Sequence, residues 1–170
     1  MRHRTKNHQG FTLIELLLYV SVVGSLLLTA IGFFATISGD RIKNQSISEV
    51  NQQASVVMGY LARTIRGASS ITSPTAGATA TGLTLTVPTA SLSPTVFNLS
   101  SGIMRVTEGS GSSVALNGGQ VTISNVTIKN LTRSGTKGTV QVSFLATHVN
   151  TSGRNEYDYQ KTFVTSVSIR

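Results

Sequence analysis

The sequence predicts an α+β fold in which one long N-terminal helix packs on an antiparallel β-sheet head. Three observations predict it. A nearly uncharged apolar run begins at residue 11, an amphipathic pattern with a period near 3.6 follows it, and alternation with a period of two fills the second half of the chain. The length of 170 residues leaves room for one soluble domain beside a segment given to a membrane.

Composition and charge narrow the classes of function. Charged residues make up 12% of the chain and cysteine is absent, which excludes a disulfide, a thiolate metal site and a cysteine nucleophile. The formal net charge is +8, but beyond the first ten residues Lys and Arg are scattered, without interleaved aromatic residues. A nucleic-acid-binding surface calls for a clustered basic stripe, so DNA contact stays a minority alternative at this stage.

The chain opens with the basic segment MRHRTKNHQG and continues with FTLIELLLYVSVVGSLLLTAIGFFATIS. This second run, residues 11–38, is about twice as long as the apolar core of a secretory signal, and no A-x-A-like cleavage site follows it closely. It is long enough to span a bilayer. Because Lys and Arg before the span hold that end in the cytoplasm, we expect the residues after it to lie outside.

Glu15 is the one charged side chain in the apolar run. A lone carboxylate in hydrocarbon costs more than ~2.5 kcal/mol, so it is usually paired or functional. In one explanation, the side chain of an uncut chain reaches the headgroups. In the other, cleavage after Gly10 leaves an α-amino group on Phe11, one helical turn from Glu15. The carboxylate of one copy then neutralises the amine of a staggered neighbour, which penalises any packing that leaves either charge alone.

An amphipathic helix half is expected over residues 39–66. Its apolar residues lie on one stripe, and Asn, Gln, Ser, Glu and Arg occupy the rest of its surface. Gly39 is expected to bend the helix rather than break it, and Gly67 is a candidate C-cap. One helix would then run from near Phe11 to Arg66, and a transmembrane helix followed by a separate coiled-coil stalk is the alternative. The apolar positions, spaced three or four apart, are Ile47, Val50, Ala54, Val57, Leu61 and Ile65.

Residues 67–82, GASSITSPTAGATATG, are low in complexity and are expected to form a connecting loop. From residue 83 the hydrophobic period is two, and glycine-containing turn signals separate the runs. The alternation changes phase after Ser124–Asn125. The pattern predicts an antiparallel meander over residues 83–170, with one buried face covered by the amphipathic helix half. Shorter strands are expected at 96–99, 103–107 and 114–116.

The head has few residues that could serve in catalysis or metal binding. His148, in SFLATHVN, is expected to be a structural strand residue, because catalysis would need partners that the sequence does not supply. Glu156 and Asp158 alternate with tyrosines, which favours a strand edge or hairpin arm, and two carboxylates fall short of the six to eight oxygens of a calcium site. We therefore predict no catalytic residue, no metal site and no cofactor, and we do not expect an enzyme.

The run Gly10–Phe11–Thr12–Leu13–Ile14–Glu15–Leu16–Leu17, preceded by a short basic leader, resembles the class III signal of type IV pilins and pseudopilins. The resemblance implies that residues 1–10 are a leader, that a prepilin peptidase cleaves after Gly10, and that Phe11 is methylated. It implies a role in filament assembly for Glu15 and a pilin-like fold for the whole chain. The cysteine pair that is frequent in the C-terminal part of these proteins is absent.

The same resemblance implies a structural subunit of a type IV pilus-like filament, closer to minor pilins and pseudopilins than to abundant shaft subunits. Its implied partners are the prepilin peptidase, sibling pilins, an inner-membrane platform protein and an assembly ATPase that acts indirectly. Its implied location is the cytoplasmic (inner) membrane, as a single-pass protein, and later a pilus or pseudopilus at the cell surface. The alternatives are a type II secretion pseudopilin and a filament-tip subunit that contacts DNA, as in DNA uptake, or a surface.

Overall fold

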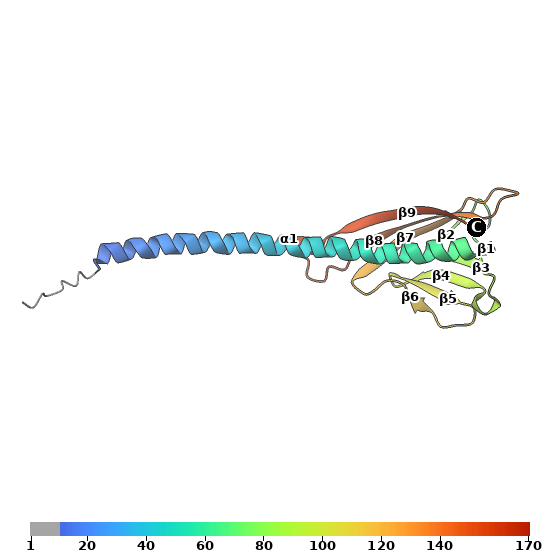
Figure 1. The fold of residues 1–170 in the computed structure, drawn as a ribbon, viewed down its shortest axis with the longest axis horizontal. Coiled ribbons are helices and arrows are strands. Elements are labelled where there is room, and N and C mark those ends of the chain that lie inside the picture. The colour runs from blue at the N-terminus through green and yellow to red at the C-terminus, as the bar shows by residue number, and fades with distance from the viewer. Residues whose placement is uncertain (1–10) are drawn as a thin grey trace, which may run out of the picture. The chain divides into compact units, whose positions relative to one another are not determined.

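The computed structural model describes residues 11–170 (Figure 1). Contacts divide the chain into two units, Met1–Arg41 and Ile42–Arg170. Helix α1, Leu13–Gly67, is continuous through the boundary between them. The expected single helix is therefore confirmed. It continues through Gly39, where one glycine costs only about 1 kcal/mol relative to alanine.

In the second unit, α1 buries the apolar stripe that the sequence predicts. Every residue of that stripe is fully buried except the first, Ile47, which is partly buried. The helix ends at Gly67, whose backbone is not left-handed, and the Ala68 N–H donates to the Ile65 carbonyl. Gly67 is thus the last helical residue and not the left-handed cap that glycine often provides. The fully buried stripe residues are Val50, Ala54, Val57, Leu61 and Ile65.

Two antiparallel sheets share one hydrophobic core with this half of α1, and Figure 1 shows their strands gathered along it. The five-stranded sheet has the order β1-β3-β4-β5-β6. Its strands are β1 (Ser70–Ser73), β3 (Leu83–Thr86), β4 (Thr95–Ser100), β5 (Ile103–Glu108) and β6 (Val114–Ala115). A turn of 3-10 helix, η1 (Ala90–Leu92), lies between β3 and β4.

The four-stranded sheet has the order β2-β7-β8-β9. Its strands are β2 (Thr79–Ala80), β7 (Val121–Asn130), β8 (Thr139–His148) and β9 (Gln160–Ser168). Along β8, buried residues alternate with half-buried ones, as expected of a strand with one face on a core. A second 3-10 turn, η2 (Asn155–Tyr157), precedes β9.

The change of phase after Ser124–Asn125 corresponds to a β-bulge. The pairing of β7 with β8 shifts between Ser124 and Thr127, and Asn125 has a φ of 50°. Asparagine is one of the few non-glycine residues that tolerate the left-handed region. Because the bulge inserts one residue, Val126 and Ile128 return to the buried face on which Val121 and Ile123 lie.

Two sequence expectations are wrong. The strands form two sheets rather than one meander, because the pattern shows which face of each strand is buried but not its partner. The segment 67–82 is not only a loop, since it contains β1 and β2. Both strands are short and rich in Ser, Thr and Ala, so neither has the apolar alternation that marks a strand in a sequence.

Candidate functional site

The first helical turn holds residues that the sequence singles out. Gly10 lies outside the described residues. Phe11 is 72% exposed, and its ring meets that of Tyr19 edge-on, with 5.8 Å between the ring centroids. Glu15 is exposed as well, one turn of helix after Phe11. Phe11 and the carboxylate of Glu15 are therefore both accessible to a partner.

Thr12 is a functional residue of this turn that the sequence reasoning missed. It immediately precedes α1, and its Oγ1 accepts a 3.3 Å hydrogen bond from the backbone N–H of Glu15. Thr-x-x-Glu at a helix start is the capping-box pattern, in which the threonine satisfies an N–H that has no partner within the helix. The pattern was readable in the sequence. Glu15 is also favourable here because a carboxylate in the first turn complements the helix dipole.

The part of α1 that follows has an apolar, exposed surface. Leu13 is 79% exposed and Phe34 is 71% exposed, and the large apolar side chains between them are exposed too. In the described chain, α1 is the one helix long and apolar enough to cross a membrane, by length and composition. An apolar surface of this extent marks an interaction with lipid or with other protein surfaces.

Four hydroxyl side chains within this apolar part are satisfied by the helix itself. Ser21 and Ser25 each donate a 2.8 Å hydrogen bond to the carbonyl three residues earlier. Thr29 and Thr36 donate to carbonyls four residues earlier, at 2.7 and 3.1 Å. A helix in hydrocarbon needs its polar groups paired internally, because no water is available to them. These hydroxyls are therefore compatible with burial in lipid.

His148 is the last residue of β8 and is 7% exposed. Its Nε2 lies 3.1 Å from Oε2 of Glu49 on α1, and its ring stacks on Tyr157 with 5.7 Å between the ring centroids. Nδ1 is buried without a hydrogen-bond partner in the described structure. The ring thus joins β8, α1 and the segment before β9, which is a structural arrangement.

Glu156 and Asp158 do not lie in a strand, and the expectation of a strand edge or hairpin arm is wrong. Glu156 is within η2, and Asp158 follows it. Arg154 Nη2 donates a 3.1 Å hydrogen bond to Glu156 Oε1, which lowers the pKa of Glu156 and raises that of Arg154. Within the described part of the chain, no group of three or more His, Cys, Asp or Glu side chains is placed to hold a metal ion.

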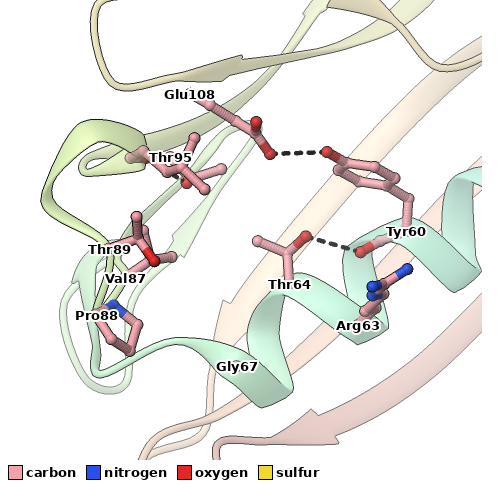
Figure 2. A pocket seen from close by; sticks show the side chains of 10 residues that line it. Tyr60, Arg63, Thr64, Gly67, Val87, Pro88, Thr89, Thr95 and Glu108 are labelled. Atoms are coloured by element: carbon pink, nitrogen blue, oxygen red, sulfur yellow. Dashed lines mark hydrogen bonds between the residues drawn. The ribbon is translucent and has the colours of Figure 1, made fainter.

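A cleft of about 420 Å³ lies between the end of α1 and the five-stranded sheet. Figure 2 shows the Tyr60 hydroxyl of α1 directed at the Glu108 carboxylate of β5, to which it donates a 2.8 Å hydrogen bond. This bond, together with burial, raises the pKa of Tyr60. Val87, Pro88 and Leu92 add apolar surface to the cleft. The arrangement braces α1 against β5.

Comparison with known proteins identifies the N-terminal segment. Residues 5–31 match the family model described as the prokaryotic N-terminal methylation motif. The match covers Gly10, Phe11, Thr12 and Glu15 and extends over the first part of α1. Neither a curated protein nor a solved structure matches the chain.

Proposed function

We propose that this chain is a minor pilin or pseudopilin and serves as a structural subunit of a filament. The N-terminal methylation motif supports the assignment of the chain as a type IV pilin-like protein or pseudopilin. The observation that carries the proposal is the continuity of one helix. The methylation motif at residues 5–31 runs into α1, and the same helix ends in the core of a β-sheet head. A long N-terminal helix followed by antiparallel sheets is consistent with the pilin-like α+β fold, whose members are structural rather than enzymatic.

Processing at the Gly10–Phe11 bond is the first step of the proposed function. A prepilin peptidase hydrolyses this bond, which frees the leader, residues 1–10, and leaves an α-amino group on Phe11, the residue that is then methylated. The exposure of Phe11 and the capped start of α1 support this assignment. Two residues, Phe11 and Thr12, remain between the cut and Leu13, the first residue of α1. The mature chain therefore keeps Thr12 as its N-cap.

Assembly is the second step, and Glu15 directs it. An unpaired carboxylate in the hydrocarbon of a bilayer is costly, so a subunit gains stability when a neighbour supplies the opposite charge. The amine of Phe11 on the next copy is that charge. Because the attraction is much stronger in a low dielectric than in water, the pair fixes the axial stagger between copies. The exposed large apolar side chains from Phe11 to Phe34 supply the remaining contact area.

The proposed location follows from charge and hydropathy. The basic leader favours a cytoplasmic N-terminus, so the head lies on the outer side of the cytoplasmic membrane. The membrane-spanning segment is then residues 11–38, and residues 39–66 are the amphipathic helix half that leads into the head. The proposed partners are the prepilin peptidase, sibling pilins, and the platform protein and ATPase that drive assembly. The filament is a pilus or a secretion pseudopilus.

Mass spectrometry of the protein purified from membranes tests the proposal. In a host with a prepilin peptidase, we expect a chain that begins at Phe11 and carries one extra methyl group. In the same host without the peptidase, we expect the chain to begin at Met1. A mature protein that retains residues 1–10 in the presence of the peptidase would overturn the proposal and leave an ordinary single-pass membrane protein.

A matched pair of glycine substitutions sharpens this test. Gly10→Val places a branched side chain at the cleaved bond, and we expect the leader to remain attached. Gly24→Val makes the same change within α1, where a Cβ has no atom within 4 Å apart from its chain neighbours and the backbone of its own helix. We expect Gly24→Val to be cleaved normally. Equal cleavage of both variants would contradict the assignment of Gly10 as the processing residue.

A further inference from the structure

Three segments that are distant in the sequence meet at one end of the second unit. The Arg170 N–H donates a 3.2 Å hydrogen bond to the carbonyl of Arg66, which ties the C-terminal residue to the last turn of α1. The Ile169 N–H donates at 2.8 Å to the carbonyl of Gly138, in the connection between β7 and β8. Figure 1 shows the end of α1, β2 and the C-terminus at this same end.

The β7–β8 connection, residues 131–138, is itself an ordered turn. The Leu131 N–H donates to the carbonyl of Thr139 at 2.8 Å, and this bond closes the base of the turn. Thr136 donates both its N–H and its hydroxyl to the carbonyl of Arg133, at 3.1 and 2.8 Å. Gly135 has a φ of 79°, which a glycine adopts without strain. The turn therefore presents its side chains from a defined backbone.

This end carries a net positive charge, because its basic side chains outnumber the α-carboxylate of Arg170. All the basic residues of the three segments are exposed. Residues 66–82, 129–139 and 168–170 contain no Asp or Glu. The ion pairs of the described structure, His148 with Glu49 and Arg154 with Glu156, lie elsewhere. We call the set the basic end; its members are Arg66, Lys129, Arg133, Lys137 and Arg170.

A group of exposed cations with no acidic side chain among them attracts polyanions. Each side chain of the basic end is free to neutralise one phosphate, and release of the counterions held by a phosphodiester chain drives such binding. The three segments contain no aromatic residue on which a base could stack. Proteins that hold single strands rely on such stacking. The chemistry therefore fits the outer phosphates of a duplex rather than the bases of a single strand.

We propose that the basic end binds the phosphate backbone of double-stranded DNA without reading its sequence. The proposal concerns the head alone and stands whether or not the chain polymerises. Lys129 projects from β7, Arg133 and Lys137 from the turn, and Arg66 and Arg170 from the ends of α1 and the chain. Contacts from separate elements engage several phosphates at once, which a single basic segment would not do.

The test uses the full chain in discs of zwitterionic lipid and a short fluorescent DNA duplex, with binding followed by anisotropy over a range of salt. For five phosphate contacts, we expect the logarithm of the binding constant to fall with the logarithm of salt at a slope of about −4.5. Arg133→Gln with Lys137→Gln should make this slope shallower by about two and weaken binding at least about tenfold.

A matched control removes the same charge elsewhere. Arg41→Gln with Lys43→Gln changes two exposed basic residues of α1 outside the basic end, and we expect the slope and the affinity to stay unchanged. Equal losses in the two double variants would overturn the proposal. It would also be overturned if a single strand bound more tightly than the duplex, or if vesicles of phosphatidylglycerol bound while the duplex did not.

Discussion

Nε2 of His148 on β8 lies 3.1 Å from Oε2 of Glu49 on α1, although 99 positions separate the two residues in the chain. His148 is 7% exposed, and its Nδ1 has no partner in the part of the chain that the structure describes. The bond to Glu49 is therefore the one hydrogen bond of this ring. It fastens the end of β8, and the Tyr157 ring stacked on it, to the helix.

Removal of that bond should destabilise the head. Glu49→Ala leaves both nitrogens of a buried imidazole without a partner, and an unsatisfied buried polar group costs about 1–3 kcal/mol. We expect the free energy of unfolding to fall by that amount in chemical denaturation of the full chain in detergent. Glu156→Ala removes an exposed carboxylate that pairs with Arg154, and its effect should be much smaller. An equal effect of the two substitutions would contradict the anchoring role of Glu49.

Asn117 joins the two sheets and should be sensitive to truncation. Its Oδ1 accepts a 2.7 Å hydrogen bond from the Met104 N–H of β5, and its Nδ2 donates at 2.7 Å to the carbonyl of Val121 in β7. The side chain is 6% exposed. Asn117→Ala leaves those backbone groups unpaired in the core, so we expect a loss of about 2–3 kcal/mol in the free energy of unfolding.

The control for Asn117 is the same substitution at Asn98. This residue lies in β4 with an exposed side chain, and no hydrogen bond of that side chain is found in the described structure. Asn98→Ala should change the free energy of unfolding by no more than about 0.5 kcal/mol. If the two alanine variants unfolded at the same denaturant concentration, Asn117 would not be the link between the sheets.

Tyr60 should make the stability of the head depend on alkaline pH. Its hydrogen bond to Glu108 raises the pKa of Tyr60 above the unfolded value, so the folded state favours the neutral phenol. The stabilisation is complete below the unfolded pKa, near 10, and is lost as pH rises through the higher folded pKa. Tyr60→Phe removes the bond, and we expect a loss of about 1 kcal/mol at neutral pH and a weaker decline of stability above pH ~10.

Unfolding measured over a series of alkaline pH values checks this prediction. Tyr157→Phe is the matched control, because it removes a phenol whose hydroxyl makes no hydrogen bond found in the described structure and keeps the ring that stacks on His148. We expect Tyr157→Phe to retain the alkaline decline of the wild type. A decline that persists in Tyr60→Phe would show that another group is responsible.

The sequence predicts those features of the fold that depend on periodicity. The apolar stripe from Val50 to Ile65 and the change of phase at Asn125 are both visible, because burial selects residue types at fixed intervals. The partition into two sheets is not visible, since it depends on which strands pair. β1 and β2 escape prediction for a different reason. Backbone pairing with β3 and β7 holds these two strands in place. Because most of their side chains are Ser, Thr and Ala, they lack the alternation of apolar residues that marks a strand in a sequence.

The candidate sites divide in the same way. Gly10, Phe11 and Glu15 are contiguous with a long apolar run, so a motif in the sequence marks them. The basic end is invisible in the sequence because its members come from three segments that only folding brings together. For the same reason, the contacts of Tyr60 with Glu108 and of Asn117 with Met104 lie beyond the reach of sequence patterns.

Two roles of Glu15 can be separated by substitution, since the residue stands in a capping box as well as in the proposed intermolecular pair. Glu15→Gln removes the charge, and glutamine still serves at this position of the box. We expect normal insertion and cleavage but no incorporation into filaments, because the Phe11 amine of the neighbouring copy would be left alone in a low dielectric. Comparison of the sheared surface fraction with the membrane fraction measures incorporation. Glu15→Ala, which removes the carboxylate and keeps the backbone N–H that donates to Thr12, should give the same result.

Thr12→Ala is the complementary variant, because it removes the hydroxyl that accepts the Glu15 N–H and leaves the carboxylate in place. The lost cap costs the helix about 1 kcal/mol at its first turn, far less than the packing of the apolar surface supplies. We therefore expect Thr12→Ala to enter filaments nearly as well as the wild type. If Thr12→Ala were excluded from the sheared fraction while Glu15→Gln were present in it, capping rather than charge pairing would be the function of Glu15.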